Sequence, residues 1–392
     1  MRRREGGGRR RRGGRSFRGG CRRGRMWPGW VGGWWRALVG GVGGDADPWV
    51  GTRVGVGGWR VEVRRKLGEG GFARVYLARD VVSGADVALK RVVCDGAEGL
   101  AAATAEVEAM QALGDHPHLV RLLDHAVVQP GAAGPRGEGE GAPGSEGRWE
   151  VLLLLEHCPG GPVTLDPEPN PAVAVRALRD CARALAHLHD RGVGHWDVKM
   201  ENVLLGADGR WKLCDFGSCC RAGRRTPATR AERAEMEAEV QAATSAAYRP
   251  PEMWDLYRGH AVGEAGDLWA LGCVAYALCY GALPFDGHSK MAVLNGSFRR
   301  PGVTGRAPAA MVALIEDLLQ QDPGDRPPAR DVEQRLDALL DALPRPPPDF
   351  VALEMGPGDG ADDELSCRGA AGDLGGVLRR LWRRWARGAN VI

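Results

Sequence analysis

The chain has 392 residues, of which 44% are hydrophobic and 26% are charged, and its formal net charge is +3. Its ten cysteines form no CxxC pair, so the sequence favours neither a zinc site nor a disulfide framework. It contains no run of about 18 uncharged apolar residues, which argues against a membrane span. The composition therefore indicates a soluble protein of a reducing compartment, and we expect it to be cytoplasmic.

The first 58 residues differ in composition from the rest. They hold 14 arginines and no lysine against three acidic residues. Such a Gly- and Arg-rich segment cannot bury enough apolar surface to offset its chain entropy, so we predict a disordered leader. RNA and anionic lipid are alternative partners for it, but nothing in it specifies either, and we do not expect nucleic-acid binding.

The pattern of apolar residues changes at Arg60. From there, alternating apolar residues in three short runs predict three antiparallel strands. Residues 100–113 have the apolar spacing of a helix, and residues 120–128 and 149–156 predict two further strands. The Gly-, Pro- and Glu-rich stretch 130–148 predicts a solvated loop insert.

The second half is helical in pattern. Apolar residues recur at three-to-four spacing over 172–191, 263–280, 307–320 and 329–343. A strand-rich half before a helix-rich half predicts an α+β fold with a small β-rich lobe and a larger helical lobe. The predicted boundaries are a leader at 1–58, a domain at 59–343 with lobes at 59–157 and 158–343, and a Pro/Gly-rich linker with a basic tail at 344–392.

A glycine-rich segment, Gly68-Glu69-Gly70-Gly71-Phe72-Ala73-Arg74-Val75, lies between the first two predicted strands. Small residues there let backbone N–H groups approach a triphosphate without obstruction by Cβ atoms. A simple hairpin turn would use the same residues, so this segment needs support from motifs downstream.

Lys90 ends the third predicted strand, where its ammonium could hold the α- and β-phosphates of a nucleotide. Glu106 on the following predicted helix is its expected ion-pair partner. Glu108 is a competing partner, but two residues along a helix turn a side chain to a direction about 160° away, so only one of the two faces the cleft.

The segment from His195 to Asn202 and the later Asp215-Phe216-Gly217 carry the groups for phosphoryl transfer. Asp197 could orient and deprotonate a substrate hydroxyl, and Lys199 could offset the charge of a γ-phosphate. Asn202 and Asp215 offer the hard oxygen ligands that Mg²⁺ prefers alongside phosphate oxygens. The spacing of these motifs therefore predicts a phosphotransferase site that uses ATP and Mg²⁺.

This ordered set resembles the protein kinase catalytic domain. Pro250-Pro251-Glu252, the segment beginning Asp267-Leu268-Trp269, and Arg326 follow at distances similar to those of the helical lobe of that family. The resemblance implies that Asp267 braces the catalytic loop and that Glu252 forms a buried ion pair with Arg326.

Several strings are similar to the Numb-associated kinases in particular, a family that includes the adaptor-associated and cyclin-G-associated kinases. These strings are Leu67–Ala73, Ala88–Arg91, Trp149–Leu152, Leu213–Ser218, Tyr248–Met253, Leu256-Tyr257, and Leu271–Cys273 through Leu283–Phe285. That family shares the Gly-Gly-Phe-Ala loop, so Ala73 is expected where other kinases have a third glycine. Over roughly residues 60–343, the resemblance implies phosphorylation of Ser or Thr, with clathrin adaptor subunits of vesicle trafficking as the family's best-known substrates.

The resemblance also assigns the nucleotide pocket. Val75 and Ala88 would form its roof, Leu204 its floor and Leu155 its back, while Glu156 and Cys158 would offer backbone groups to adenine. The full predicted nucleotide-binding set is Leu67, Gly68, Glu69, Gly70, Gly71, Phe72, Val75, Ala88, Lys90, Leu155, Glu156, Cys158 and Leu204.

Three departures from the family stand out, and the largest is Trp196, where an Arg usually holds a phosphorylated residue of the activation segment. We therefore expect activity that does not depend on phosphorylation of that segment. The stretch 161–170 is short and Pro-rich, and Pro250 replaces an Ala.

Ser245 matches the position at which Ser/Thr kinases place a hydroxyl near the catalytic Asp and Lys. This match favours hydroxyl substrates of Ser and Thr over tyrosine. Thr226, Thr229 and Thr244 are candidate autophosphorylation sites, and none is preferred.

Two further segments suggest partners. Asp47-Pro48-Trp49 resembles the short peptides that clathrin adaptor appendages bind, and residues 378–387 could form a basic amphipathic helix at an anionic membrane. Such contacts would place the protein peripherally at membranes or clathrin-coated structures. The alternative function is a catalytically weak nucleotide-binding scaffold, in which Trp196 distorts the loop around Asp197.

Overall fold

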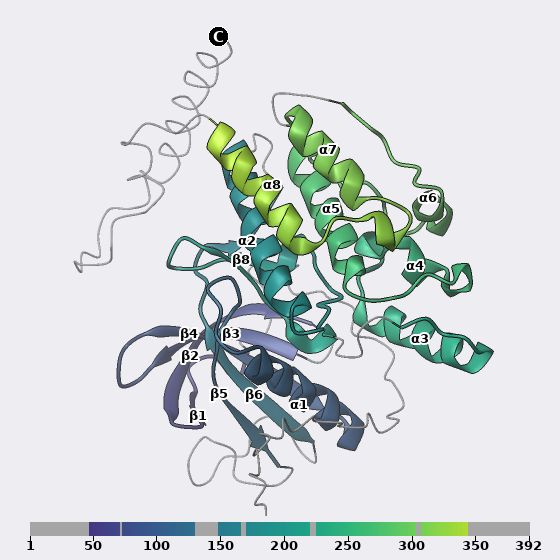
Figure 1. Cartoon of the computed structure of the whole chain (residues 1–392). Helices are drawn as coiled ribbons and strands as arrows, with labels where there is room; N and C mark the ends of the chain where they lie inside the picture. The colour runs from purple at the N-terminus through teal and green to yellow at the C-terminus, as the bar shows by residue number, and fades with distance from the viewer. Residues whose placement is uncertain are drawn as a thin grey trace, which may run out of the picture.

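The computed structural model describes residues 47–70, 73–129, 148–165, 170–219, 225–302 and 307–343. Its first part is a six-stranded sheet with one long helix, and its second part is mostly helical (Figure 1). The predicted α+β fold of two lobes is confirmed. The leader up to residue 46, the insert at 130–147, Gly71, Phe72 and the tail from 344 lie outside the described residues.

The six strands pair in the order β1-β2-β3-β4-β6-β5, and every neighbouring pair is antiparallel. Helix α1 (Gly96–Leu113) packs on this sheet. The strands are β1 (Arg53–Val56), β2 (Trp59–Glu69), β3 (Ala73–Asp80), β4 (Asp86–Cys94), β5 (Leu122–Val128) and β6 (Trp149–Glu156).

Strand β4 is buried on both faces, because successive side chains of a strand point to opposite sides. Val92 and Cys94 belong to the large core shared with α1 and the helical lobe. Val87 and Leu89 belong to a second core on the outer face of the sheet. The sheet therefore separates two apolar clusters.

The outer cluster corrects the predicted start of the folded domain. Residues 47–58 were expected in a disordered leader, but Arg53–Val56 form strand β1 on β2, and Trp49 is 1% exposed. The Trp49 ring stacks on Tyr76 with centroids 6.1 Å apart, and the Tyr76 hydroxyl donates to Asp47 Oδ2 at 3.2 Å. Glycines interrupt the apolar pattern here, so β1 was missed.

The same burial contradicts the hypothesis that Asp47-Pro48-Trp49 is an adaptor-binding peptide. The Trp49 indole lies inside the outer cluster, and Asp47 accepts hydrogen bonds from Tyr76 and from the Trp49 backbone N–H. An adaptor could reach the indole only if the segment left the sheet.

The helical lobe contains seven α-helices in its described residues (Figure 1). They are α2 (Pro171–His189), α3 (Arg230–Ala243), α4 (Pro251–Trp254), α5 (Ala265–Tyr280), α6 (Lys290–Leu294), α7 (Ala309–Leu318) and α8 (Ala329–Ala342). Helix α5 is buried along nearly all of its length and contacts α2 and α7. A small sheet of β7 (Gly161–Pro162), β8 (Val203–Leu205) and β9 (Trp211–Leu213) faces the other lobe.

Helix α3 was not predicted from the apolar spacing, since only Met236 and Val240 of it are buried. Its start is fixed by a capping box: Thr229 Oγ1 accepts from the Glu232 N–H, and the Glu232 carboxylate accepts from the Thr229 N–H. Thr229, named above as a candidate autophosphorylation site, is thus the N-cap of a helix. No helix in the described part of the chain is both long and apolar enough to cross a bilayer.

Candidate active site

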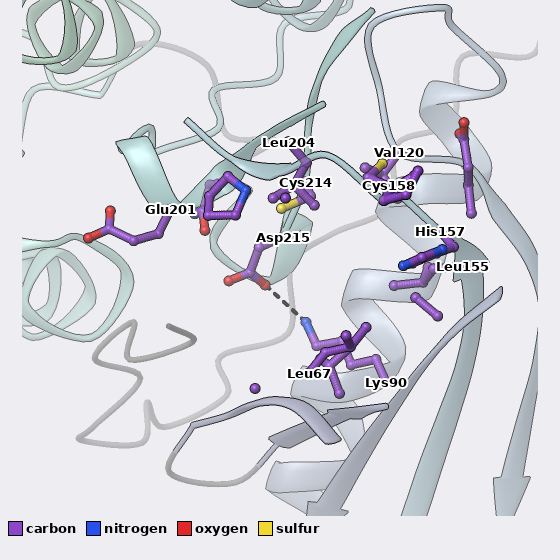
Figure 2. A pocket seen from close by; sticks show the side chains of 18 of the residues that line it. Leu67, Lys90, Val120, Leu155, His157, Cys158, Glu201, Leu204, Cys214 and Asp215 are labelled. Carbon is purple, nitrogen blue, oxygen red and sulfur yellow. Dashed lines mark hydrogen bonds and ion pairs between the residues drawn. The ribbon is translucent and has the colours of Figure 1, made fainter. Parts of the chain in front are cut away.

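A cavity of about 410 Å³ lies where the six-stranded sheet meets the small sheet, a size typical of small-ligand sites. In Figure 2, Leu67 and Leu204 lie on opposite sides of this cavity, and the Lys90 side chain points to Asp215. The predicted residues that line it are Leu67, Gly68, Val75, Ala88, Lys90, Glu106, Leu155, Glu156, Cys158, Leu204, Asn202 and Asp215.

Lys90 is the centre of the charged end of the cavity. Its Nζ atom lies 2.6 and 2.7 Å from the two carboxylate oxygens of Glu106 and 2.9 Å from Asp215 Oδ1. Lys90 and Glu106 are each 2% exposed, so both charges are desolvated and stabilise each other. The predicted pairing with Glu106 rather than Glu108 is thus observed, and the contact with Asp215 was not foreseen.

The pairing sets the protonation of these groups. Burial alone would lower the pKa of Lys90, but the charges of Asp215 and Glu106 outweigh it and raise that pKa above its usual value. Burial works to raise the pKa of Asp215, yet the Lys90 ammonium holds that pKa below its usual value. Burial raises the pKa of Glu106. Lys90 is therefore a cation at neutral pH, with a carboxylate facing it from Asp215.

A second polar cluster surrounds Asp197. Lys199 Nζ donates to Asp197 Oδ2 at 2.5 Å, and the Ser245 hydroxyl donates to Asp197 Oδ1 at 2.7 Å. Lys199 Nζ also donates to the Ser245 hydroxyl at 3.3 Å. The expected placement of a hydroxyl between the predicted catalytic Asp and Lys is observed, although Ser245 is distant from both in sequence.

Asn202 joins the two clusters. Its amide Nδ2 donates to the Asp197 carbonyl oxygen at 2.8 Å and to Asp197 Oδ2 at 3.3 Å, while Asn202 also lines the cavity. The donor side of this amide is thus occupied by Asp197. Its oxygen is the atom that could bind a metal ion.

The backbone that carries Asp197 is strained and braced. Trp196 has φ 65° and Asp215 has φ 66°, the only positive φ values of non-glycine residues in the described chain. Asp267 Oδ2 accepts from the His195 N–H at 2.8 Å, and Asp267 Oδ1 accepts from the Trp196 N–H at 2.7 Å. The brace that the resemblance implied for Asp267 is observed.

Behind this brace, Glu252 and Arg326 form the implied buried ion pair. Both side chains are fully buried, with two bonds of 2.7 Å between guanidinium and carboxylate. Arg326 also donates to the Ala265 carbonyl oxygen at 2.8 Å. The pair ties α4 and the start of α5 to the turn that precedes α8.

The glycine-rich segment contributes unevenly. Gly68 lines the cavity, and the Gly70 N–H donates to the Ala73 carbonyl oxygen at 2.7 Å, closing the turn. The Glu69 side chain instead forms ion pairs of 2.8 Å with Lys66 and Arg74 on the flanking strands. Its carboxylate therefore stiffens the hairpin, and we place no ligand contact on it. Gly71 and Phe72 lie outside the described residues.

The predicted hinge residues lie at the far end of the cavity, where Leu155 and Glu156 end β6. The Glu156 N–H donates to the Arg121 carbonyl oxygen, and its carboxylate accepts from Lys212 at 2.5 Å. Burial raises the pKa of the Cys158 thiol to about 12, so this side chain lines the cavity as an uncharged thiol.

Sequence reasoning missed several lining residues. They are Arg65, Met110, Val120, His157, Pro159, Gly160, Gly161, Pro162, Thr164, Glu201, Cys214 and Phe216. Five of the twelve adjoin a predicted residue, as Cys214 adjoins Asp215, and adjacency is the signal that could have found those five. Met110 and Val120 are reached only through the packing of α1 on the sheet.

The donor set fits a magnesium nucleotide. The apolar walls from Leu67, Val75 and Leu204 suit a flat base, and the opposite end holds one ammonium and two carboxylates. No group of three or more His, Cys, Asp and Glu side chains with metal-binding geometry exists in the described residues. Mg²⁺ does not need such a cage, because it keeps waters and takes phosphate oxygens.

Comparisons with known proteins agree with this site. The model of the protein kinase domain matches residues 61–336. The chain is 35% identical over 286 residues to "Serine/threonine-protein kinase ppk30" of Schizosaccharomyces pombe, covering 71% of this chain and 28% of that protein. It is 32% identical over 318 residues to "Actin-regulating kinase 1" of Saccharomyces cerevisiae, covering 78% of this chain and 48% of that protein.

A third relative is "Protein kinase domain-containing protein ppk38" of Schizosaccharomyces pombe, 33% identical over 291 residues, or 71% of this chain and 42% of that protein. The chain thus spans less than half the length of each of these relatives. The matched region begins after β1 and runs into α8, so it contains both polar clusters described above. The chain belongs to the protein kinase family.

Proposed function

We propose that the chain is a serine/threonine protein kinase that transfers the γ-phosphoryl group of ATP to Ser and Thr hydroxyls of proteins. The observation that carries the proposal is the Asp197 carboxylate, which accepts bonds from a hydroxyl and an ammonium at 2.7 and 2.5 Å beside the Lys90 cavity. A substrate hydroxyl would donate to the same carboxylate. The relative named as a serine/threonine-protein kinase, ppk30, supports the Ser/Thr class.

In this mechanism, positioning does most of the work. Lys90, held by Glu106, binds the α- and β-phosphates, and Lys199 offsets charge on the γ-phosphate. Mg²⁺, held by Asn202 and Asp215, would neutralise developing charge on the phosphate oxygens. As the acceptor oxygen forms its bond to the γ-phosphorus and the bond to the β-phosphate oxygen breaks, Asp197 accepts the hydroxyl proton and ADP leaves.

The alternative of a weak nucleotide-binding scaffold depends on a distorted loop around Asp197. The Asp197 carboxylate keeps its contacts with Lys199, Ser245 and Asn202. The Trp196 N–H also keeps its bond to Asp267. This geometry favours the enzyme.

We infer at a finer level that the chain is a Numb-associated kinase and that clathrin adaptor subunits are among its substrates. The support is the set of shared strings, among them Leu67–Ala73 and Leu213–Ser218. A cytoplasmic site of action, peripheral at membranes or clathrin-coated structures, follows from the same inference. The buried Trp49 gives this inference no help, so adaptor contact would come through the substrate cleft or through segments outside the described residues.

The test uses the full chain with ATP, Mg²⁺, a clathrin adaptor medium subunit and a generic Ser/Thr peptide. Asp197→Asn is the control, because it keeps the shape of the side chain and removes the proton acceptor. Transfer to both acceptors that is lost in the control supports the enzyme and the finer inference. Transfer to the peptide alone supports the kinase and removes the adaptor, and nucleotide binding without transfer favours the scaffold.

A further inference from the structure

Trp196 directly precedes Asp197 and is 5% exposed. It forms a cluster with five buried apolar residues of the helical lobe, which we call the Trp196 cluster: Met236, Val240, Met253, Leu256 and Val262. The indole Nε1 has no hydrogen-bond partner in the described structure. The side chain is therefore held mainly by apolar contacts and not through its N–H group.

The backbone makes room for this ring. A Cβ atom on Gly194 would lie 2.9 Å from the Trp196 Cδ1 and Nε1 atoms, so any larger residue would push the indole out of place. Gly194 does not have a positive φ, so the space that the indole needs, and not the backbone conformation, explains the glycine at this position. Gly194 and Trp196 thus form a size-matched pair at the start of the catalytic loop.

The other half of the cluster belongs to α3. Met236 and Val240, four residues apart, lie on one face of that helix and are its only buried residues. Arg225 adds a second link: its guanidinium lies 5.5 Å from the Trp196 ring and bonds Glu239 of α3 at 2.6 Å. In Figure 1, α3 lies at the edge of the helical lobe, so this face is its main attachment.

Helix α3 leads directly to the contact at Asp197. It ends at Ala243, and Thr244 then donates from its hydroxyl to the Val240 carbonyl oxygen at 2.7 Å. The next residue, Ser245, bonds Asp197. The Trp196 cluster therefore joins the residue before Asp197 to the helix turn before Ser245, so it spans both sides of the Asp197–Ser245 contact.

We propose that Trp196 is a positioning residue that fixes α3 and the segment around Ser245 against the catalytic loop by apolar contact, without a phosphorylated residue. This rests on the proposed kinase function. An Arg at this position would need an anionic partner to hold the segment, whereas the indole needs only the α3 face. Because the backbone at Trp196 is strained, burial of the indole also offsets the cost of the conformation that presents Asp197.

The experiment uses the full chain, treated with a phosphatase and shown by intact mass spectrometry to carry no phosphate. Rates are measured with ATP and a Ser/Thr peptide for the wild type and for Trp196→Ala, Trp196→Phe, Met236→Ala and the double variant Trp196→Ala/Met236→Ala. Leu336→Ala in α8 is the matched control, because Leu336 is fully buried but lies outside the Trp196 cluster.

We expect the phosphate-free wild type to remain active. Trp196→Ala should lower kcat/KM for the peptide about tenfold or more while KM for ATP changes less than about twofold. Met236→Ala should act in the same direction, and the double variant should add little, because both changes break one contact. Trp196→Phe should recover most of the rate, and Leu336→Ala should lower only the melting temperature.

Hydrogen exchange of residues 230–243 gives a readout that needs no activity. Loss of the contacts in the Trp196 cluster should speed exchange in α3. A wild type that shows no transfer either before or after phosphatase treatment, but with faster exchange in Trp196→Ala, would end the proposed function and keep the contact between Trp196 and α3. Transfer that is present before the treatment and lost after it would overturn the proposal. If Trp196→Ala does not fold, Met236→Ala and Gly194→Ala decide in its place. Unchanged exchange and unchanged peptide kinetics, or effects that simply add, would overturn the proposal.

Discussion

Lys90 and Arg91 are neighbours on strand β4, yet one lies in the candidate active site and the other in the scaffold. Both are at most 3% exposed, and each is paired with a glutamate that is 2% exposed, Glu106 or Glu150. Because they point to opposite faces of the sheet, only Lys90 lines the cavity. Burial and ion pairing alone therefore do not distinguish a site from a support.

The difference lies in how each cation is enclosed. Arg91 has one bidentate carboxylate, and its guanidinium lies 4.5 Å from the Trp49 ring, which covers the pair. Lys90 faces two carboxyl groups, from Glu106 and Asp215, and this trio borders an open cavity. Lys90 and Asp215, the predicted magnesium ligand, therefore both border the cavity, whereas the Arg91–Glu150 pair is closed off from it.

The largest effect should come from Lys90→Met. It removes the phosphate-binding cation and lets Glu106 and Asp215 take up protons, so the fold should survive. We expect ATP-dependent transfer to fall about 10³-fold, with a small change in melting temperature. Initial rates and thermal unfolding measure both. Loss of folding with retained activity per folded molecule would place Lys90 with the scaffold.

Arg91→Met should show the reverse pattern. It leaves the Glu150 carboxylate buried without its partner, so the free energy of unfolding should fall by about 3 kcal/mol, the lower end for breaking a buried pair. Urea unfolding measures the loss. KM for ATP of the folded variant should match that of the wild type. A large rise in KM would mean that Arg91 also contributes to nucleotide binding.

Trp49→Ala tests what covers the Arg91 pair. Loss of the indole should lower the free energy of unfolding by roughly 2 kcal/mol, less than in a rigid core because the segment can relax onto the sheet. Val50→Ala is the control, since Val50 is 42% exposed beside it. Combined with Arg91→Met, the Trp49→Ala loss should be non-additive. Equal effects of the two single alanine changes would mean that Trp49 does not close the pair.

These contrasts also show what the sequence could and could not predict. Lys90, Asp197, Asn202 and Asp215 were identified because chemistry fixes their residue types at characteristic spacings. Ser245 was assigned by resemblance and lies as expected against Asp197.

The misses share a physical cause. Trp49 and helix α3 are held by contacts with residues far away in sequence, Tyr76 and Arg91 for the former and Trp196 for the latter. Local periodicity carries no signal of such contacts. The Lys90–Asp215 bond joins residues 125 positions apart, so only the fold could show it.

The smallest effect concerns His116, a half-buried basic group with no carboxylate partner. His116 packs on His187 with ring centroids 4.3 Å apart, and His118 lies 5.7 Å away. Burial first, then His187, His118 and Arg191, lowers the pKa of His116 to about 4. Lys90 is fully buried and His116 half-buried, but the carboxyl groups of Asp215 and Glu106 raise the pKa of Lys90, whereas the surroundings of His116 favour its neutral form.

The sign of the pH effect follows from linkage. The unfolded chain binds a proton at His116 below about pH 6.5 while the folded chain resists it until about pH 4, so stability is complete above pH 6.5 and falls toward pH 4. In His116→Gln, the free energy of unfolding lost between pH 6.5 and pH 4 should be smaller than in the wild type by roughly 1 kcal/mol at most. The effect is small because the ring is only half-buried. Urea unfolding at several pH values measures it. A slope that His116→Gln leaves unchanged would mean that water or an acidic group reaches the ring, and that burial without a partner does not set its pKa.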